Sequence, residues 1–399
     1  MNSPEGGAAA SAPVDDRIER IRRTLEGVMG IPATEGNRLD VLRNGDEIFP
    51  AMLAAIEDAE HTIDLLTFVY WKGEIGMRFA EALAARAREG VRVRVLLDAW
   101  GSRPISRALT DLMETAGVRV RWFRPLHRLE PGKMNHRTHR KVMIVDEATG
   151  FTGGVGIADE WTGDARDETE WRDTHFRVGG PAVDGLRAAF LDNWAETELQ
   201  LFEDGVDRFP QQPKPGRSVV QCVRGESEAG WSDVSMLLLT LLQLAERRVR
   251  ITTAYFVPDE ELCERLCAAA ARGVEVDILL PGPHADKRFV QLGSEAVYGP
   301  LLEAGVRIWN FQPSMLHAKV LTVDGLVASV GSANFNARST ELDEEVNLVV
   351  LDPDLAETLD GHFDEDLERS VLIDRDRWED RPLGQQVLEK IVTPLRDHF

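Results

Sequence analysis

A long internal repeat limits the possible folds of this chain more than any other feature. The segment AEHTIDLLTFVYW, which begins at Ala59, is matched by AERRVRITTAYFV from Ala245. Further along, AGVRVRWFRP from Ala116 is matched by AGVRIWNFQP from Ala304, which gives a separation of 304 − 116 = 188 residues. Solenoids and propellers repeat every ~20–50 residues. A period this long therefore predicts two duplicated domains.

Each copy has the pattern of an apolar strand, an amphipathic helix, a glycine and a second apolar strand. The predicted strands are 63–70 and 91–97 in the first copy, and 249–256 and 274–280 in the second. Strands that alternate with helices indicate an α/β fold, in which helices cover a largely buried sheet.

The Pro-rich stretch FPQQPKPGRS lies between the copies and is typical of a linker. We predict a disordered tail and basic amphipathic helix at 1–37, domains at 38–208 and 219–373, a linker at 209–218, and a C-terminal amphipathic segment at 374–399. Two apolar faces mark the terminal segments: Ile18, Ile21, Leu25 and Val28, and then Leu383, Val387, Ile391 and Leu395. Packing on the core is the favoured interpretation of both, and contact with a membrane surface is the alternative.

Composition restricts the class of partner. The net charge is 46 − 68 = −22, which argues against a general nucleic-acid coat protein because phosphate attraction needs a basic surface. A phosphodiester-processing enzyme stays possible if basic groups gather at its site. The sequence shows no secretory signal and no apolar run of the ~20 residues that a membrane span needs. With three cysteines and no metal-binding spacing among them, we expect a cytoplasmic location.

A polar motif recurs in both copies. HRKVMIVD and HAKVLTVD share the pattern His-x-Lys followed by an aspartate five residues later, which gives His139, Lys141 and Asp146, and His317, Lys319 and Asp324. Both motifs run into apolar, β-branched residues and are predicted on strands, where side chains two apart share a face. A single histidine on a strand is usually structural. The same His–Lys pair at matched places of a duplicated fold favours a function.

Two histidines and two lysines suit phosphodiester chemistry. Fixed ammonium groups would offset the charge that develops on the phosphate oxygens. One neutral imidazole can attack phosphorus, and the other, when protonated, can donate to the leaving alkoxide. The lysines supply the positive charge, so no metal or other cofactor is expected. Asp146 and Asp324 complete the candidate catalytic motif, although a structural role as hydrogen-bond acceptors or ion-pair partners is favoured for them.

Five further polar or glycine positions are substrate-binding or orienting candidates. Ser332 and Asn334 of GSAN could donate to phosphate oxygens, whereas the first copy has GGVG, with Gly154 at the place of the serine. We therefore expect a chemically asymmetric site. Asp173 and Glu345 each precede an apolar strand, and each could orient the histidine of its half.

The duplicated motif resembles that of the phospholipase D superfamily, over nearly the whole chain from about Arg38. Within that superfamily the flanks are most similar to bacterial cardiolipin synthases, on the segments NHRTHRKVMIVD, GGVGIADEW, WRDTHFRVGGPAV, LHAKVLTVDG and GSANFNARSTELDEEVNLVV. Gly156 and Asp343 depart from this pattern, because asparagine is usual at both places. The resemblance implies two α/β sandwich domains related by a pseudo-two-fold axis, with one active site at their interface.

The resemblance also implies roles and substrates. His139 would be the nucleophile that forms a phosphatidyl–histidine, and His317 the general acid and base. Lys141, Lys319 and Asn334 would bind phosphate. The acceptor would be phosphatidylglycerol and the donor a second phosphatidylglycerol or a CDP-diacylglycerol. The alternatives are a phospholipase D that uses water, a nuclease-like phosphodiesterase, and a fold that only binds lipid or a partner.

Lipid substrates imply peripheral association with the inner face of the cell membrane. An acidic protein would need a local basic patch for this contact. Two sets of residues could supply one: Arg17, Arg20, Arg22 and Arg23, or Lys133, Arg137 and Arg140.

Overall fold

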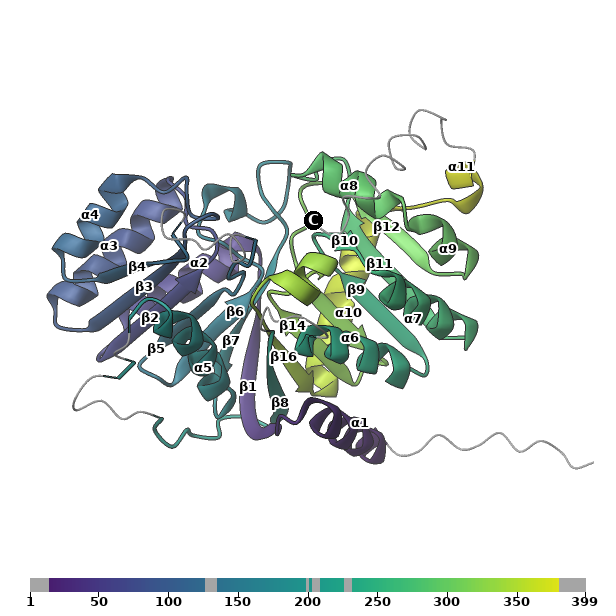
Figure 1. Cartoon of the computed structure of the whole chain (residues 1–399), viewed down its shortest axis with the longest axis horizontal. Helices are drawn as coiled ribbons and strands as arrows, with labels where there is room; N and C mark the ends of the chain where they lie inside the picture. The colour runs from purple at the N-terminus through teal and green to yellow at the C-terminus, as the bar shows by residue number, and fades with distance from the viewer. Residues whose placement is uncertain (1–13, 126–134, 199–200, 203–208, 226–231, 380–399) are drawn as a thin grey trace, which may run out of the picture.

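The computed structural model describes residues 14–125, 135–198, 201–202, 209–225 and 232–379, which form two lobes side by side (Figure 1). In the first lobe the strands follow the spatial order β1 (Thr34–Arg43), β7 (Thr174–Gly179), β6 (Thr149–Gly153), β5 (Val142–Val145), β2 (Thr62–Thr67), β3 (Arg92–Asp98) and β4 (Arg119–Phe123). In the second lobe the order is β8 (Ser218–Gly225), β16 (Glu345–Leu351), β14 (Val327–Gly331), β13 (Val320–Val323), β9 (Arg248–Thr252), β11 (Glu275–Pro281) and β12 (Arg307–Phe311), with β17 (Ser370–Leu372) beyond it. The two orders correspond strand for strand.

The two sheets join at their edges. Strand β1 pairs antiparallel with β8, with Thr34 opposite Val220 and Asn37 opposite Ser218, so fifteen of the described strands form one sheet. A two-residue strand pair, β10 (Phe256–Val257) with β15 (Phe335–Asn336), lies apart from it. The predicted duplicated α/β fold is confirmed. Strand β1 begins before residue 38, where the first domain was predicted to start. Strand β8 begins at Ser218, the last residue of the predicted linker.

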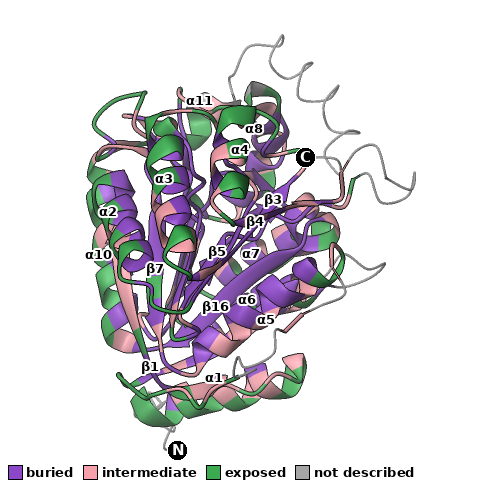
Figure 2. Cartoon of the chain, turned by 90° about the vertical axis from the view of Figure 1, so that its left-hand side faces the viewer, coloured by how far each residue is buried: buried purple, intermediate pink, exposed green. Residues whose placement is uncertain are grey.

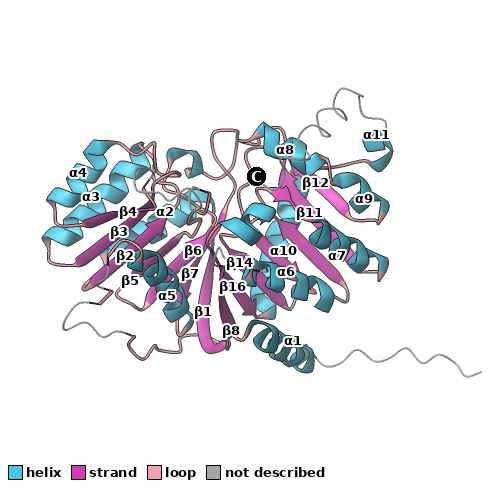
Figure 3. Ribbon diagram, in the orientation of Figure 1, coloured by secondary structure: helices cyan, strands magenta, loops and turns pink. Residues whose placement is uncertain are grey.

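Helices cover the sheet in both lobes (Figure 3). The first lobe contains α2 (Asn44–Glu57), α3 (Glu74–Arg88), α4 (Arg107–Thr115) and α5 (Ala182–Ala195). The second contains α6 (Asp233–Leu244), α7 (Glu260–Ala271), α8 (Arg288–Glu295), α9 (Tyr298–Glu303), α10 (Pro353–Glu368) and α11 (Arg375–Glu379). The strands are mostly buried between these helices (Figure 2).

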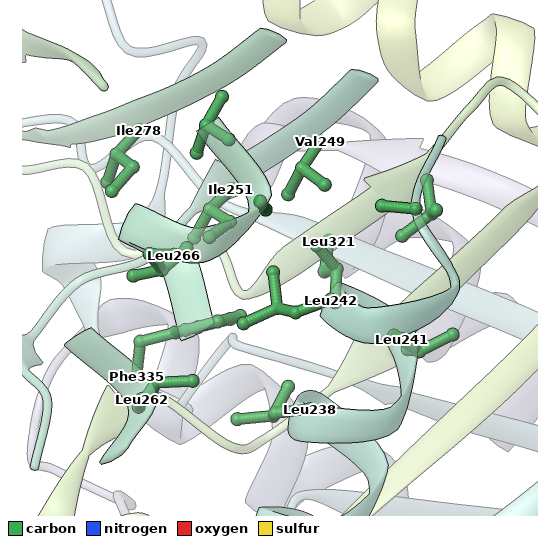
Figure 4. Close-up of a cluster of buried hydrophobic side chains, with 14 of the residues drawn as sticks. Leu238, Leu241, Leu242, Val249, Ile251, Leu262, Leu266, Ile278, Leu321 and Phe335 are labelled. Atoms are coloured by element: carbon green, nitrogen blue, oxygen red, sulfur yellow. The ribbon is translucent and has the colours of Figure 1, made fainter. Parts of the chain in front are cut away.

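Each lobe has its own hydrophobic core, and a third cluster joins them. Figure 4 shows part of the second-lobe core, where Leu238 and Leu242 of α6 and Leu266 of α7 face Ile251 and Leu321 of the sheet. The joining cluster combines first-lobe residues such as Phe190 with second-lobe residues such as Leu348. Because the two lobes share buried apolar surface, their relative position is held by packing as well as by the chain.

Two strands end earlier than predicted. Strand β2 ends at Thr67 and β9 at Thr252, so neither reaches the predicted ends at 70 and 256. In both places a threonine hydroxyl donates to a main-chain oxygen two residues on, Thr67 to Val69 at 3.0 Å and Thr253 to Tyr255 at 3.2 Å. Such local hydrogen bonds compete with the backbone hydrogen bonds between neighbouring strands of the sheet. The segments beyond them turn toward the histidines.

Helix α1 (Val14–Met29) packs on the second lobe, as the favoured interpretation held. Ile21 and Leu25 are buried there, whereas Val28 is 45% exposed, so the predicted apolar face is wrong at its last position. The arginines of this helix form ion pairs within the chain, namely Arg17 with Asp324 and Glu246, Arg20 with Glu246, Arg22 with Glu19, Glu26 and Glu35, and Arg23 with Glu19. The predicted tail to residue 13 and apolar face at Leu383, Val387, Ile391 and Leu395 lie outside the described residues. Among the described helices, none has the length and apolarity required to cross a bilayer.

Candidate active site

Both motif histidines lie where the two lobes meet. The backbone N–H of His139 donates to the carbonyl of Glu344 in the second lobe at 2.9 Å, next to a bridge between Thr138 and Glu344. The N–H of His317 donates to Arg172 of the first lobe at 2.7 Å. The prediction that these histidines sit on strands is therefore wrong. They precede β5 and β13, because their backbone bonds to the opposite lobe instead of to the neighbouring strand.

The orienting carboxylates are exchanged between the lobes. Nδ1 of His139 lies 3.0 Å from Glu345 Oε1 of the second lobe, and Nδ1 of His317 lies 2.9 Å from Asp173 Oδ2 of the first. The prediction that each carboxylate orients the histidine of its own half is therefore wrong. The correct pairing follows from the backbone bonds, which set each histidine beside the residue that precedes the carboxylate of the other lobe.

This pairing fixes the proton on each ring. An ionised carboxylate only accepts, so Nδ1 of both histidines carries the hydrogen and Nε2 keeps its lone pair. In His317 the Lys319 Nζ lies 3.3 Å from that Nε2 and can donate to it. His139 is 8% exposed and His317 is 5% exposed. Burial lowers the pKa of His139 to about 4 and that of His317 to about 3, and the neighbouring carboxylates offset this only in part. Both imidazoles are therefore neutral at pH 7 before a substrate binds.

The motif lysines are buried beside the histidines. Lys141 Nζ donates to the carbonyl of His139 at 2.8 Å, and Lys319 Nζ donates to that of His317. Burial lowers the pKa of Lys141 to about 8 and that of Lys319 to about 7, partly offset by Asp173 and Glu345. The charge of Lys319 also lowers the pKa of His139, and that of Lys141 lowers the pKa of His317. The two motifs thus interact across the lobe boundary.

Both carboxylates are themselves held in place. Ser332 Oγ donates to Glu345 Oε2 at 2.5 Å and Ser339 Oγ to Oε1 at 2.7 Å, while Trp161 Nε1 donates to Asp173 Oδ2 at 2.8 Å. Burial raises the pKa of both carboxyls, but the adjacent imidazoles and lysines outweigh it and lower both to about 2. Both are ionised at pH 7.

Sequence reasoning missed Trp161 and Ser339. They are matched positions, since 161 − 139 = 22 and 339 − 317 = 22, and each donates to the carboxylate of its own lobe. The equal spacing from the motif was the signal that could have identified them. Their side chains differ so much in type that a comparison by residue identity passes over them.

The asymmetry between GGVG and GSAN has a steric cause. A Cβ at Gly154 would lie 2.3 Å from Asp173 Oδ1, and one at Gly156 would lie 2.6 Å from Cβ of Val69. In the second lobe Ser332 gives its hydroxyl hydrogen to Glu345, which differs from the phosphate contact expected for it. Asn334 Oδ1 is buried and has no hydrogen-bond partner among the described residues. This oxygen is an acceptor, so only the side-chain NH2 of Asn334 could donate to a phosphate oxygen, and that role stays a prediction.

The motif aspartates lie at the opposite ends of their strands from the histidines. The Asp146 carboxylate accepts from the backbone N–H groups of Glu60, His61 and Thr62 at 2.7–2.8 Å. The Asp324 carboxylate does the same for Glu246, Arg247 and Arg248 at 2.7–3.0 Å. These contacts anchor the start of β2 and of β9, which is the kind of structural role that the sequence favoured for both.

The second proposed basic patch is internal where it is described. Arg137 is buried and pairs with Asp98 at 3.0 Å. Arg140 is buried and donates to the carbonyl of Glu345 at 3.1 Å. These two arginines join elements of the protein and present no charge to a membrane, and Lys133 lies outside the described residues. Within the described part of the chain, no group of three or more histidine, cysteine or acidic side chains is arranged to hold a metal ion.

Known proteins resemble this chain in sequence and in fold. The family described as "Cardiolipin synthase, PLD-like domain" matches residues 52–171 and 238–367. Cardiolipin synthase of Geobacillus kaustophilus is 35% identical over 370 residues, which cover 91% of this chain and 73% of the relative. Cardiolipin synthase 1 of Bacillus cereus is 32% identical over 398 residues, covering 96% and 78%. The crystal structure of phosphatidylserine synthase from Haemophilus influenzae Rd KW20 has a TM-score of 0.73 at 15% identity, over 95% of this chain and 100% of that one.

Proposed function

This chain belongs to the cardiolipin synthase family of the phospholipase D superfamily, and from that membership we propose that it transfers a phosphatidyl group to phosphatidylglycerol through a phospho-histidine intermediate. The observation that carries the proposal is the exchanged pairing of His139 with Glu345 and of His317 with Asp173. It leaves two imidazole Nε2 atoms with lone pairs, at one lobe boundary and with two buried lysines beside them.

In the first half-reaction, His139 Nε2 attacks the phosphorus of the donor lipid. A P–N bond forms, the P–O bond to the donor's head group breaks, and His317 gives its proton to the departing oxygen. His317 needs a proton for this step, although its pKa is about 3 in the unliganded protein. A bound phosphodiester is an anion and raises the pKa of an adjacent imidazole. Proton uptake therefore accompanies substrate binding.

In the second half-reaction, a hydroxyl of the acceptor phosphatidylglycerol gives its proton to His317 Nε2 while its oxygen attacks phosphorus. The P–N bond breaks, and His139 returns to its starting form. Lys141, Lys319 and the amide of Asn334 supply the positive and dipolar groups for the phosphate oxygens. The donor is a second phosphatidylglycerol or a CDP-diacylglycerol, and the protein acts on the inner face of the membrane. Hydrolysis, in which water replaces the acceptor, is the second candidate.

The test is to incubate the purified protein with phosphatidylglycerol vesicles and to identify the lipid products by mass spectrometry. New diphosphatidylglycerol is the expected product, and an alkaline quench should trap a phosphatidyl group on His139. His139→Ala should abolish both signals, whereas His61→Ala, which removes an exposed imidazole, should keep them. Phosphatidic acid alone would identify a hydrolase instead. Cleavage of nucleic acid without any lipid product would contradict the proposal altogether.

A further inference from the structure

Two exposed aromatic side chains lie on the side of the molecule that carries the histidines. Trp100, in the turn after β3, is 55% exposed, and Phe289, near the start of α8, is 47% exposed. Strands β3 and β11 occupy matching places in the two lobes. Each runs parallel to a strand that pairs antiparallel with the strand following the motif histidine, so both end on the histidine side. The exposed aromatics therefore come from corresponding parts of the two lobes.

The first-lobe turn is fixed beside His139. The backbone N–H of Trp100 donates to Asp98 Oδ1 at 2.8 Å. Ser102 Oγ donates to the carbonyl of Phe68 at 3.0 Å, and the Phe68 ring stands edge-on to His139 with centroids 5.2 Å apart. These hydrogen bonds hold the turn in a position that leaves the Trp100 side chain exposed, although tryptophan is usually largely buried and is enriched at contact surfaces.

The second-lobe segment that leads into α8 is tied to His317 in a similar way. Its one acidic residue between positions 282 and 289 is Asp286, which accepts from the Tyr255 hydroxyl at 2.8 Å. The Tyr255 ring stands edge-on to the His317 ring with centroids 6.2 Å apart, and Lys287 Nζ lies 4.7 Å from the centre of the Tyr255 ring. In each lobe, the segment with the exposed aromatic is thus anchored to an aromatic residue beside the histidine.

Cations accompany both exposed aromatics. The segment 99–106 contains Arg103 and no acidic residue, and the Arg103 guanidinium lies 5.3 Å from the centre of the Trp100 ring. Lys72 lies next to this turn, because its backbone N–H donates to a carbonyl of the turn at 3.3 Å. Lys72, Arg103 and Lys287 are exposed, and none of the three forms an ion pair with another residue in the part of the chain that the structure describes. Their charges are therefore available to an anionic surface.

Helix α1 has the opposite arrangement. Its Arg17 pairs with Asp324, which lies at the end of its strand away from His317. Figures 1 and 2 show α1 at the lower end of the molecule, whereas α4, which follows the Trp100 turn, and α8 lie in its upper part. Every arginine of α1 pairs with an acidic side chain of the protein. This helix therefore offers less net positive charge to a lipid surface than the histidine side does.

We propose that the histidine side of the protein docks on an anionic lipid bilayer, with Trp100 and Phe289 inserted among the lipid head groups. Lys72, Arg103 and Lys287 then meet the lipid phosphates. Tryptophan is favoured at the interface of a bilayer. Because the whole chain has a charge of −22, contact with an anionic leaflet needs such local cations. This orientation turns the lobe boundary toward the lipids. The inference rests on the proposed function and names the surface through which the enzyme reaches its substrates.

The binding experiment measures how the full chain partitions onto sedimenting phosphatidylglycerol vesicles. Trp100→Ser/Phe289→Ser should lower the partition coefficient about tenfold or more. Arg103→Ala should lower it about fivefold at low salt, and added salt should remove this difference. The matched control is Val14→Ser/Val28→Ser in α1, whose side chains are 53% and 45% exposed. This control should partition like the wild type.

Activity on two forms of one substrate separates docking from chemistry. Phosphatidylglycerol with short acyl chains dissolves as monomers and needs no docking. The aromatic double variant should therefore convert it at the wild-type rate, while its rate on vesicles falls with its partitioning.

The outcomes separate the two proposals. The docking surface is overturned if the wild type does not bind phosphatidylglycerol vesicles, or if an aromatic double variant that melts at the wild-type temperature partitions like the wild type. Loss of partitioning in the α1 control also overturns it, because α1 would then be the contact. A wild-type protein that converts neither vesicles nor short-chain phosphatidylglycerol refutes the proposed function itself.

Discussion

Acid should destabilise this protein because the imidazoles of its two motifs are buried without charge. His139 and His317 have pKa values of about 4 and about 3 in the folded chain, whereas an unfolded histidine titrates near ~6.5. Between these values the unfolded chain binds protons that the folded chain does not bind. Stability from this source is complete above pH ~6.5 and is lost progressively as the pH falls toward 4.

The size of the effect follows from the two shifts. One proton bound only by the unfolded state changes the unfolding free energy by ~1.4 kcal/mol per pH unit. From pH 6.5 to 5 each histidine therefore costs roughly 1.5 kcal/mol, because the unfolded imidazole is only half protonated at pH 6.5, and the pair costs about 3 kcal/mol. Lys141 and Lys319 stay protonated in both states at pH 5, because even their lowered pKa values are about 8 and about 7. The site carboxylates contribute mainly below pH ~4.5, where they begin to protonate in the unfolded chain.

The direct assay is the number of protons taken up when the protein is unfolded by urea at pH 5. The double variant His139→Asn/His317→Asn should take up about two protons fewer than the wild type. His61→Asn, which removes an exposed imidazole, should match the wild type. Equal uptake by the double variant and the wild type would show that both imidazoles are already protonated in the folded protein at pH 5, and the argument from burial would then be refuted.

Four further substitutions test the contacts of the site. Asp146→Asn weakens three bonds from backbone N–H groups and should lower the unfolding free energy by about 2 kcal/mol in urea denaturation, with the turnover of the folded protein unchanged. Asp324→Asn should cost more, because the carboxylate also pairs with the buried Arg17. Gly154→Ala would press a methyl group to 2.3 Å from Asp173 Oδ1, and we expect turnover to fall about 100-fold or more in steady-state assays. Trp161→Phe removes one donor to Asp173 and should lower kcat about tenfold, with KM little changed.

The sequence was sufficient for the duplicated fold because a repeat constrains both halves together. The matched strands and the recurrence of His-x-Lys predicted two equivalent lobes, and the structure has corresponding strand orders. The local sequence pattern could not predict which lobe supplies the carboxylate beside each histidine. Glu345 lies 206 residues from His139 and Asp173 lies 144 residues from His317. That choice is made by long-range backbone bonds, which leave no periodic signal in the chain.

Side-chain roles were harder to predict than positions for the same reason. A serine in GSAN could donate to a ligand or to a neighbouring carboxylate, and only packing decides between them. Here Ser332 lies 2.5 Å from Glu345, so its one hydrogen is used within the protein. Packing also explains the glycine at position 154, because Asp173 occupies the space that a side chain there would need.

The unequal surroundings of the two histidines bear on which of them attacks. Duplication supplies two imidazole–carboxylate pairs of the same kind, yet a transferase needs one nucleophile and one acid–base group that meets the alcohol. The acid–base group must stand next to the place where alcohols enter and leave. The Phe68 ring stands edge-on to His139, whereas the rings of Trp161, Trp171 and Tyr255 surround His317. Because both imidazoles are neutral and each pairs with a carboxylate, the position of the trapped phosphatidyl group separates the two orders: it lies on His139 in the proposed order and on His317 in the reverse one.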